Sequence, residues 1–319
     1  MVYNLANKRK SVLVTGASGF LGRELIELLI YRDDFMVLAL TSSKERLTSF
    51  FGNTSSLECF NINEWKDKKL PWHKVDILIH CAFARGYRTD KEIAESLDFT
   101  NKLFLDAIEN DVKNIINISS QGVYGQGSKP FWKEDNPVCP QDLYSFAKYA
   151  SELLVSNIRK ISNKKVNVTN LRLASLTGPK DNLHLEVISK FVIKALKSET
   201  INIIGGHQKF SYLDVRDASS AIISLLYTEP ENWKEVYNLG SNQQHNIIEI
   251  ASIVSEVAKK YTRKPVKIEV LKKDINLDVG MDSSLFYEDT GWKPQYNIKD
   301  IIVSLFDYFS DIIKNEDGD

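Results

Sequence analysis

The first half of the chain alternates short apolar runs with segments in which apolar residues recur at helical spacing. Phe20 to Tyr31 is the first predicted helix, because four leucines share one face: Leu21, Leu25, Leu28 and Leu29. Further helices are expected around Lys102 and Leu153. The apolar runs predict buried strands at Ser11–Thr15, Phe35–Leu40, Leu57–Ile62, Val75–His80 and Asn114–Ser119. This alternation indicates βαβ units, which build a parallel sheet with right-handed crossovers.

The second half is more mixed. Helices are predicted at Leu185–Leu196, Ala218–Tyr227, Ile247–Tyr261 and Ile298–Ile313, and strands at Val166–Arg172 and Val266–Leu271. The apolar positions of the last helix are expected in the core: Ile301, Ile302, Leu305, Phe306, Phe309 and Ile312. We therefore predict an α/β fold: a Rossmann-type doubly wound parallel sheet with a smaller C-terminal α/β substrate domain. Residues 1–174 and 208–241 would form the dinucleotide-binding domain, and residues 175–207 and 242–319 the substrate-binding domain.

Composition narrows the function classes. The 319 residues are 43% hydrophobic and 26% charged with a net charge of −1, as in a globular protein without a basic nucleic-acid footprint. No apolar segment is long enough to span a membrane. The cysteines are odd in number and widely separated: Cys59, Cys81 and Cys139. This argues against a disulfide framework and for a cytoplasmic protein. The five histidines lack metal-ligand spacing, so no metal is expected.

A glycine-rich turn joins the first strand to the first helix. Gly16, Gly19 and Gly22 would permit a tight turn, close approach to a pyrophosphate, and close packing of helix on strand. Backbone N–H groups at the helix start would face the phosphates. The turn therefore predicts a dinucleotide site that also includes Ser18, Phe20 and Leu21.

The tip of the second strand distinguishes between cofactors. An acid that would bind the NAD ribose is expected about 20 residues after the glycines. The chain instead has Thr41, Ser42 and Ser43, followed by Lys44 and Arg46. Hydroxyls and cations suit a 2′-phosphate, so NADP is favoured over NAD, although the two cations could simply start a solvated helix.

Tyr144 and Lys148 lie four residues apart, on one face of a predicted helix. The spacing predicts a tyrosine that acts as a general acid/base, with the lysine ammonium beside it. Lowering a tyrosine pKa from about 10 to neutral requires about 4 kcal/mol. One ammonium at about 4 Å in an effective dielectric of about 20 supplies that order of energy. Tyr87 and Lys91 have the same spacing but follow a strand in a charged stretch without an apolar helix face. Ser120, at the end of another strand, adds a hydroxyl beside Tyr144.

With these motifs the sequence resembles the extended short-chain dehydrogenase/reductase family, in its NAD(P)-dependent nucleotide-sugar epimerase/dehydratase branch. The resemblance covers nearly the whole chain. Besides the motifs above, it rests on residues 75–82 and 118–125, Glu134, Pro137, Pro140, Glu152, Leu171-Arg172, Gly178-Pro179, and residues 212–217, 237–240 and 291–294.

The resemblance implies a role for each matching residue. Tyr144 would be the acid/base, Lys148 the ribose ligand and pKa tuner, and Ser120 the partner of the substrate hydroxyl. The residues beside the cofactor would be Ser119, Asn61, Ile62, Cys81, Ala82 and Phe83, and those near the substrate would be Arg85, Ser120, Gln121, Ser175 and Lys209. Family dimers form through helices that correspond to those around Lys102 and Leu153, so a homodimer is expected; alternatively, the apolar positions face the sheet.

Departures from the family pattern narrow the chemistry. Gln121-Gly122 stands where sugar 4,6-dehydratases carry Asp-Glu, so dehydration is not expected. Ser175 replaces a common asparagine, and Lys209 stands near a common arginine. The leading hypothesis is a nucleotide-sugar 4-epimerase or 4-ketoreductase. The alternatives are an NADPH-dependent reductase of a small non-sugar ketone or aldehyde, and an inactive dinucleotide-binding sensor.

Overall fold

A computed structural model describes residues 9–162, 165–180 and 186–316. Its largest sheet has seven strands in the order β11-β6-β5-β4-β1-β2-β3. β1 pairs in parallel with β2 and β4, β2 with β3, and β4 with β5. The strands are β1 (Lys10–Thr15), β2 (Phe35–Thr41), β3 (Leu57–Asn61), β4 (Ile77–His80), β5 (Asn114–Ser120), β6 (Asn167–Leu173) and β11 (Val236–Leu239). Strand order reverses between β1 and β4, as in Rossmann-type doubly wound sheets.

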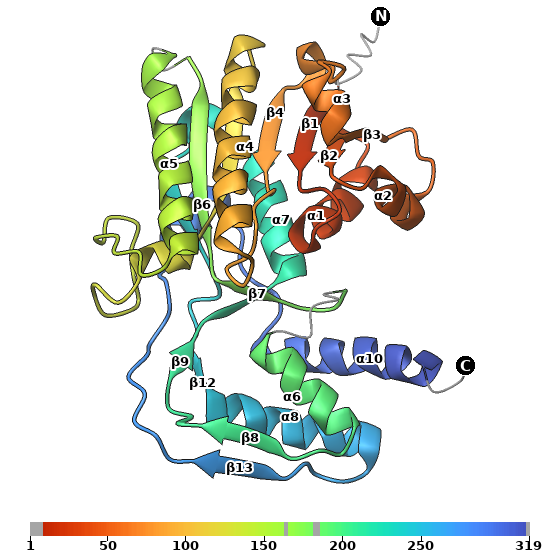
Figure 1. The fold of residues 1–319 in the computed structure, drawn as a ribbon, viewed down its shortest axis with the longest axis vertical. Helices are drawn as coiled ribbons and strands as arrows, with labels where there is room; N and C mark the ends of the chain where they lie inside the picture. The colour runs from red at the N-terminus through yellow and green to blue at the C-terminus, as the bar shows by residue number, and fades with distance from the viewer. Residues whose placement is uncertain (1–8, 163–164, 181–185, 317–319) are drawn as a thin grey trace, which may run out of the picture. The chain divides into compact units, whose positions relative to one another are not determined.

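Helices flank this sheet. They are α1 (Phe20–Ile30), α2 (Lys44–Phe51), α3 (Ile62–Lys66), α4 (Asp90–Glu109) and α5 (Leu143–Ile161), with the 3₁₀ helices η1 (Trp72–Lys74) and η2 (Gln121–Tyr124). α4 and α5 lie side by side along the sheet (Figure 1). Leu13, Leu38, Leu78 and Ile115 of the strands share one apolar core with Leu103, Phe104, Val155 and Ile158 of these two helices. The predicted fold class is confirmed.

Contacts divide the chain into two compact units. The first contains residues 9–125, 138–172 and 222–237, and the second contains 126–137, 173–221 and 238–316, apart from the undescribed residues. The second contains β7 (Ser175–Thr177), α6 (Val187–Leu196), β8 (Ile201–Ile204), β9 (Lys209–Phe210), β10 (Tyr212–Asp214), β12 (His245–Asn246), α8 (Ile247–Thr262), β13 (Ile268–Leu271), α9 (Ser284–Thr290) and α10 (Ile298–Glu316). α7 (Val215–Leu226) crosses the boundary, and η3 (Pro230–Asn232) follows it. The assignment of a cofactor to one domain and a substrate to the other stays a prediction.

The core of the second unit lies between α6, α8 and α10. Ile302, Leu305 and Phe306 of α10 are fully buried there with Val192 and Val254. The predicted core face of the last helix is therefore confirmed at five positions, and Ile312 is partly buried against the same cluster. Paired two-stranded sheets, β10–β7, β12–β9 and β13–β8, complete this unit.

The sequence located the long elements and missed the short ones. The fourth strand begins at Ile77 rather than Val75, because Val75 ends η1. The last predicted strand begins at Ile268 rather than Val266. The two-residue strands β9 and β12 are too short to show an alternating pattern. Residue 185, where the helix corresponding to α6 was predicted to start, lies outside the described residues.

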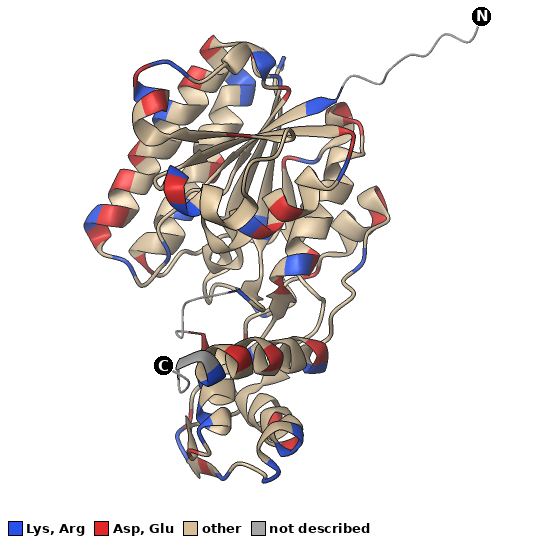
Figure 2. Cartoon of the chain, turned by 90° about the vertical axis from the view of Figure 1, so that its right-hand side faces the viewer, with Lys and Arg blue, Asp and Glu red and all other residues tan. Residues whose placement is uncertain are grey.

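Lys and Arg residues are interspersed with Asp and Glu over the helices of both units (Figure 2). Within the described ranges, no helix combines the length and the apolar character that a bilayer crossing requires. In those same ranges, His, Cys, Asp and Glu side chains form no group of three that could hold a metal ion.

Candidate active site

The glycine turn brings two backbone segments into contact. Gly16 has a positive φ of +64°, and a Cβ on it would stand 2.8 Å from the Ala82 backbone. A Cβ on Gly22 would stand 2.3 Å from the Gly16 carbonyl oxygen. The glycines therefore allow the loop after β1, the start of α1 and the loop after β4 to meet at the point where strand order reverses.

The start of α1 is suited to an anion. Gly19 caps the helix without a side-chain hydrogen bond, whereas side chains cap α2, α3, α4 and α5. The first N–H groups of a helix have no partner inside the helix, and the helix dipole favours negative charge at that end. The close glycine packing and this uncapped helix start fit the diphosphate of a dinucleotide.

A buried histidine ties these loops together. The Thr100 hydroxyl donates to the Ser96 carbonyl oxygen, so it accepts from Nε2–H of His80 at 2.8 Å. Nδ1 of His80 then accepts from the Thr15 hydroxyl at 2.8 Å, and that hydroxyl oxygen accepts from the Ala82 N–H at 3.3 Å. Burial lowers the pKa of His80 to about 3. His80 is therefore a neutral bridge between β1, β4 and α4.

The predicted adenosine-side residues surround the ends of β2 and β3. The Thr41 hydroxyl donates to Ser18 Oγ at 2.8 Å, which joins the tip of β2 to the glycine turn. Lys44 lies 3.2 Å from the Glu64 carboxylate. The amide oxygen of Asn61 accepts from the Glu64 N–H, in the capping box of α3. Lys44 and Asn61, predicted to bind cofactor, thus already have partners within the protein, while Ile62 is the first residue of α3.

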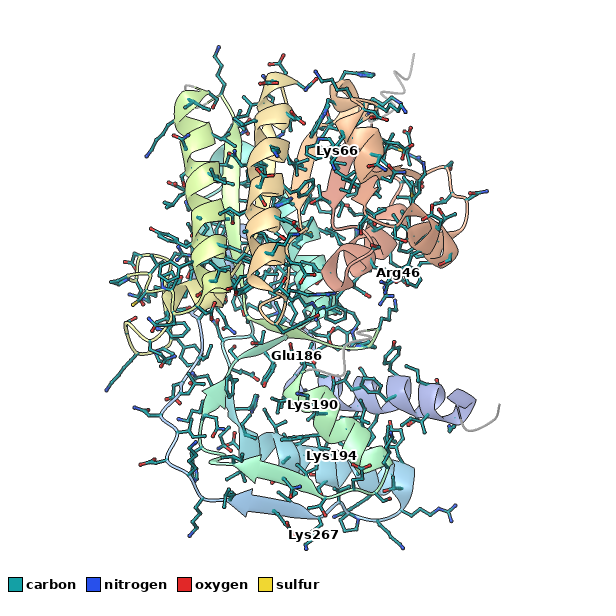
Figure 3. All side chains as sticks on the ribbon, viewed as in Figure 1. Arg46, Lys66, Glu186, Lys190, Lys194 and Lys267 are labelled. Carbon is teal, nitrogen blue, oxygen red and sulfur yellow. The ribbon has the colours of Figure 1, made fainter. Side chains whose placement is uncertain are left out.

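Two guanidinium groups lie at the same end of the sheet. Arg46 of α2 (Figure 3) lies 5.7 Å from the centre of the Phe50 ring. Arg23 of α1 lies 4.6 Å from that ring and is largely buried. Arg23 was not predicted from the sequence, because its proximity to Phe50 depends on how α1 and α2 pack. Ser43 caps α2, which confirms that Lys44 and Arg46 lie in the first turn of a helix.

Ser120, Tyr144 and Lys148 come together at the ends of β5 and α5. The capping box of Asp142 fixes the start of α5, and Tyr144 lies in its first turn. Ser120 Oγ accepts from the Gly122 N–H at 3.1 Å, and the Ser120 side chain hydrogen-bonds Tyr144. Lys148 Nζ donates to the Ile118 carbonyl oxygen at 2.8 Å. By contrast, Tyr87 lies outside any helix, because α4 begins at Asp90.

The loop after β4 covers this group. The Phe83 ring lies edge-on to Tyr144 at 6.2 Å, and the Lys148 ammonium lies 4.0 Å from the Phe83 ring centre. A Cβ on Gly86 would stand 3.4 Å from the Tyr144 ring. Arg85 lies over Phe20, at the start of α1. Residues 81–86 therefore form one wall beside Tyr144 and Lys148.

Burial dominates the titration of both groups. It raises the pKa of Tyr144, against the Ser120 hydrogen bond and the positive charge of Arg85. It lowers the pKa of Lys148 to about 7, against the effects of Cys81 and Glu152. The tuning of Tyr144 by Lys148 stays a prediction: in this structure the ammonium donates to the Ile118 carbonyl oxygen, and burial is the largest influence on the pKa of the phenol.

A buried network stands behind the site. Ser119 Oγ donates to the Glu152 carboxylate, which also accepts from Arg172. Arg172 donates in addition to the Tyr124 hydroxyl at 2.9 Å. In the sequence, Glu152 and Arg172 stood out only as positions that match the family pattern. Ser119, predicted beside the cofactor, thus bonds into the interior.

The predicted substrate residues fall in both units. Ser120, Gln121 and Arg85 belong to the first unit, and Gln121 is buried at the start of η2. Ser175 and Lys209 belong to the second. There Ser175 pairs with Tyr212 in the β7–β10 sheet, and Lys209 pairs with Asn246. Arg85, Ser120 and Gln121 therefore belong to one unit, and Ser175 and Lys209 belong to the other.

Comparisons with known proteins agree with this architecture. A model of the NAD dependent epimerase/dehydratase family matches residues 12–240. The chain is 27% identical to UDP-glucose 4-epimerase of Vibrio cholerae over 91% of this chain and 93% of that protein. It is 26% identical to dTDP-4-dehydro-6-deoxyglucose reductase of Escherichia coli, with coverages of 93% and 97%. UDP-glucuronic acid 4-epimerase from Bacillus cereus, solved with NAD, has the same fold, with a TM-score of 0.81, 21% identity, and coverages of 95% and 99%.

The family match spans most of the chain. This protein belongs to the NAD dependent epimerase/dehydratase family and is an enzyme of the extended short-chain dehydrogenase/reductase type.

We expect His80 to make stability depend on pH. Its folded pKa of about 3 lies below the ordinary 6.5, so its contribution is present above pH 6.5 and declines as pH falls toward 3. Between pH 7 and pH 4 the native protein should lose about 3 kcal/mol that His80→Gln does not lose. Urea unfolding across this range measures the difference, with the exposed His73→Gln as control. If the free energy of unfolding changed with pH in the same way for the native protein and for His80→Gln, the role of His80 as a neutral buried bridge would be contradicted.

Proposed function

We propose that this protein is a nucleotide-sugar 4-epimerase or 4-ketoreductase that acts by hydride transfer at Ser120, Tyr144 and Lys148. The observation that carries the proposal is the grouping of these three side chains beside the loop after β4. It is supported by the two relatives named above, whose names give a nucleotide-sugar epimerase and a nucleotide-sugar reductase. The absence of an acid at Gln121-Gly122 favours these activities over dehydration.

The residues present fit a nicotinamide dinucleotide. Gly16, Gly19 and Gly22, with the uncapped start of α1, would hold the diphosphate. Thr41, Ser43 and the two guanidinium groups near Phe50 would surround the adenosine end. Residues 81–83 would line the nicotinamide end. The bound nicotinamide supplies or accepts the hydride.

The side chains then have distinct tasks. Tyr144 would donate a proton to the substrate oxygen in the reducing direction and accept it in the oxidising direction. Ser120 accepts from the Gly122 N–H and hydrogen-bonds Tyr144, so its hydroxyl would meet the reacting oxygen beside the phenol. Lys148, protonated, would hold a ribose hydroxyl and favour ionised Tyr144. The cationic oxidised ring would add the positive charge that lowers the Tyr144 pKa.

Tyr144→Phe tests the acid/base assignment. It should lower turnover of UDP- or dTDP-linked sugars about 10²- to 10⁴-fold, because a positioned acid/base contributes that order. The matched control is Tyr87→Phe, which has the same sequence spacing to a lysine but lies outside α5 and should retain activity. Product analysis by mass spectrometry and nicotinamide absorbance checks both. Full activity of Tyr144→Phe would contradict the assignment; turnover of simple ketones but of no nucleotide sugar would favour the non-sugar reductase.

NADP is the preferred cofactor in this proposal. The β2 tip has hydroxyls in place of an acid, and Arg46 and Arg23 both lie near Phe50. Lys44 would contribute less to binding a 2′-phosphate than the sequence alone suggests, because the Glu64 carboxylate balances its charge.

Arg46→Ala should weaken NADPH binding about tenfold and NADH binding little, because the lost cation faces only a 2′-phosphate. Fluorescence titration measures both affinities. Lys66→Ala, on neighbouring α3 (Figure 3), is the control and should change neither. Equal affinity of the native protein for the two cofactors would refute the preference.

We also propose a homodimer through α4 and α5. Leu105, Phe146 and Leu153 are 42%, 57% and 53% exposed on these adjacent helices. A two-fold contact would cover them.

Leu153→Glu should convert a dimer of about twice 36.4 kDa into monomer, because it would bury a charge in an apolar contact. Sedimentation velocity measures the mass. Leu271→Glu, at a 66% exposed position of the other unit, should leave it unchanged. A native protein that sediments as a monomer at high concentration would rule the dimer out.

A further inference from the structure

An ion pair without access to water lies one helical turn behind Lys148. Glu152 and Arg172 are 3% and 4% exposed. Arg172 donates to the carboxylate through Nε at 3.0 Å and through Nη2 at 2.7 Å. Replacing such a pair with apolar residues is often neutral or stabilising, because desolvation opposes the attraction. Stability is therefore a weak explanation for its presence.

Both members of the pair reach the strand end that carries Ser120. Ser119, the preceding residue, donates to Glu152. Tyr124, four residues after Ser120, accepts from Arg172 and lies under its guanidinium at 4.8 Å. Lys148 is bonded to the same strand through the Ile118 carbonyl oxygen. The pair and Lys148 thus share one rigid frame.

Few charges act on Lys148. From the end of β4 it faces His80 and Cys81, and burial keeps the first neutral and raises the pKa of the second to about 12. On its own helix, Tyr144, whose pKa is also raised, lies four residues before Lys148, and Glu152 lies four residues after it. Phe83 adds an uncharged ring. Among these groups, Glu152 is the carboxylate, and it is held against Arg172.

We propose that the Glu152–Arg172 pair sets the charge of Lys148: Glu152 is the counter-ion that keeps the buried ammonium protonated, and Arg172 fixes the carboxylate and limits its effect. This inference rests on the proposed function, in which Lys148 acts as a cation. It makes Glu152 and Arg172 positioning residues that do not contact the substrate.

The two halves of the pair should shift the titration of Lys148 in opposite directions. Glu152→Gln leaves Arg172 unbalanced, so the midpoint should fall by about one pH unit or more. Arg172→Gln leaves Glu152 unbalanced, so the midpoint should rise by a similar amount. Activity that needs the ammonium is present below its pKa and lost above it. The high-pH limb of kcat/KM should therefore move with the midpoint.

The experiment reads the titration directly. The ¹³Cε resonance of Lys148 in ¹³C-lysine-labelled protein, identified by its loss in Lys148→Met, is followed against pH without cofactor. Arg172→Lys keeps the charge and loses the forked geometry, so its midpoint should match the native one. Since either single charge-removing variant could fail to fold, Glu152→Gln/Arg172→Gln is included. It leaves no unbalanced charge, and its midpoint should fall by less than that of Glu152→Gln.

A merely structural pair would lower stability and rate without opposite midpoint shifts. Shifts in the same direction, or below about 0.2 pH unit in both single variants, would overturn the inference. If the single variants do not fold, a double variant with the native midpoint and the native high-pH limb would overturn it. Opposite shifts combined with a fully active Tyr144→Phe would leave the inference standing and remove the proposed function.

Discussion

The contact between the backbones that follow β1 and β4 is the constraint on which the rest of the site depends. Gly16 and Ala82 approach so closely that a Cβ on Gly16 would stand 2.8 Å from two Ala82 backbone atoms. Because β1 and β4 are neighbours at the reversal of strand order, this contact lies at the carboxyl ends of the strands, where open α/β sheets bind their ligands. The start of α1 and the wall of residues 81–86 both take their positions from it.

Desolvation determines the chemistry that such a site can perform. The buried polar groups near these strand ends are paired inside the protein: His80 with two threonines, and Glu152 with Arg172 and Ser119. Lys148 is held by one carbonyl oxygen, and burial has brought its pKa to about 7. A lysine in that range responds strongly to each nearby charge. The site therefore couples the charge of Lys148 to groups that never contact a substrate.

The long elements and the fold class could be predicted from the sequence because apolar spacing records burial. The position of each tyrosine relative to the predicted strands also distinguished Tyr144 from Tyr87. In the structure, Tyr144 follows the N-cap of α5, whereas Tyr87 precedes the N-cap of α4. What the sequence could not reveal are contacts between distant segments. Lys44 was expected near a phosphate and lies against Glu64, and Arg23 reaches Phe50 through helix packing. Tuning of Tyr144 by Lys148 was inferred from spacing, which says nothing of where the ammonium points.

Isotope transfer tests the proposed hydride chemistry most directly. Nucleotide sugars deuterated at C4 are incubated with the protein and oxidised cofactor, and the nicotinamide and sugar are analysed by mass spectrometry. Hydride transfer at this site predicts deuterium on the nicotinamide and reduced-cofactor absorbance while the substrate is oxidised. In an epimerase the same deuterium then returns to C4 of the product sugar, and Tyr144→Phe should show neither signal. Loss of the C4 deuterium to water, or turnover without any reduced cofactor being formed, would contradict hydride transfer at C4.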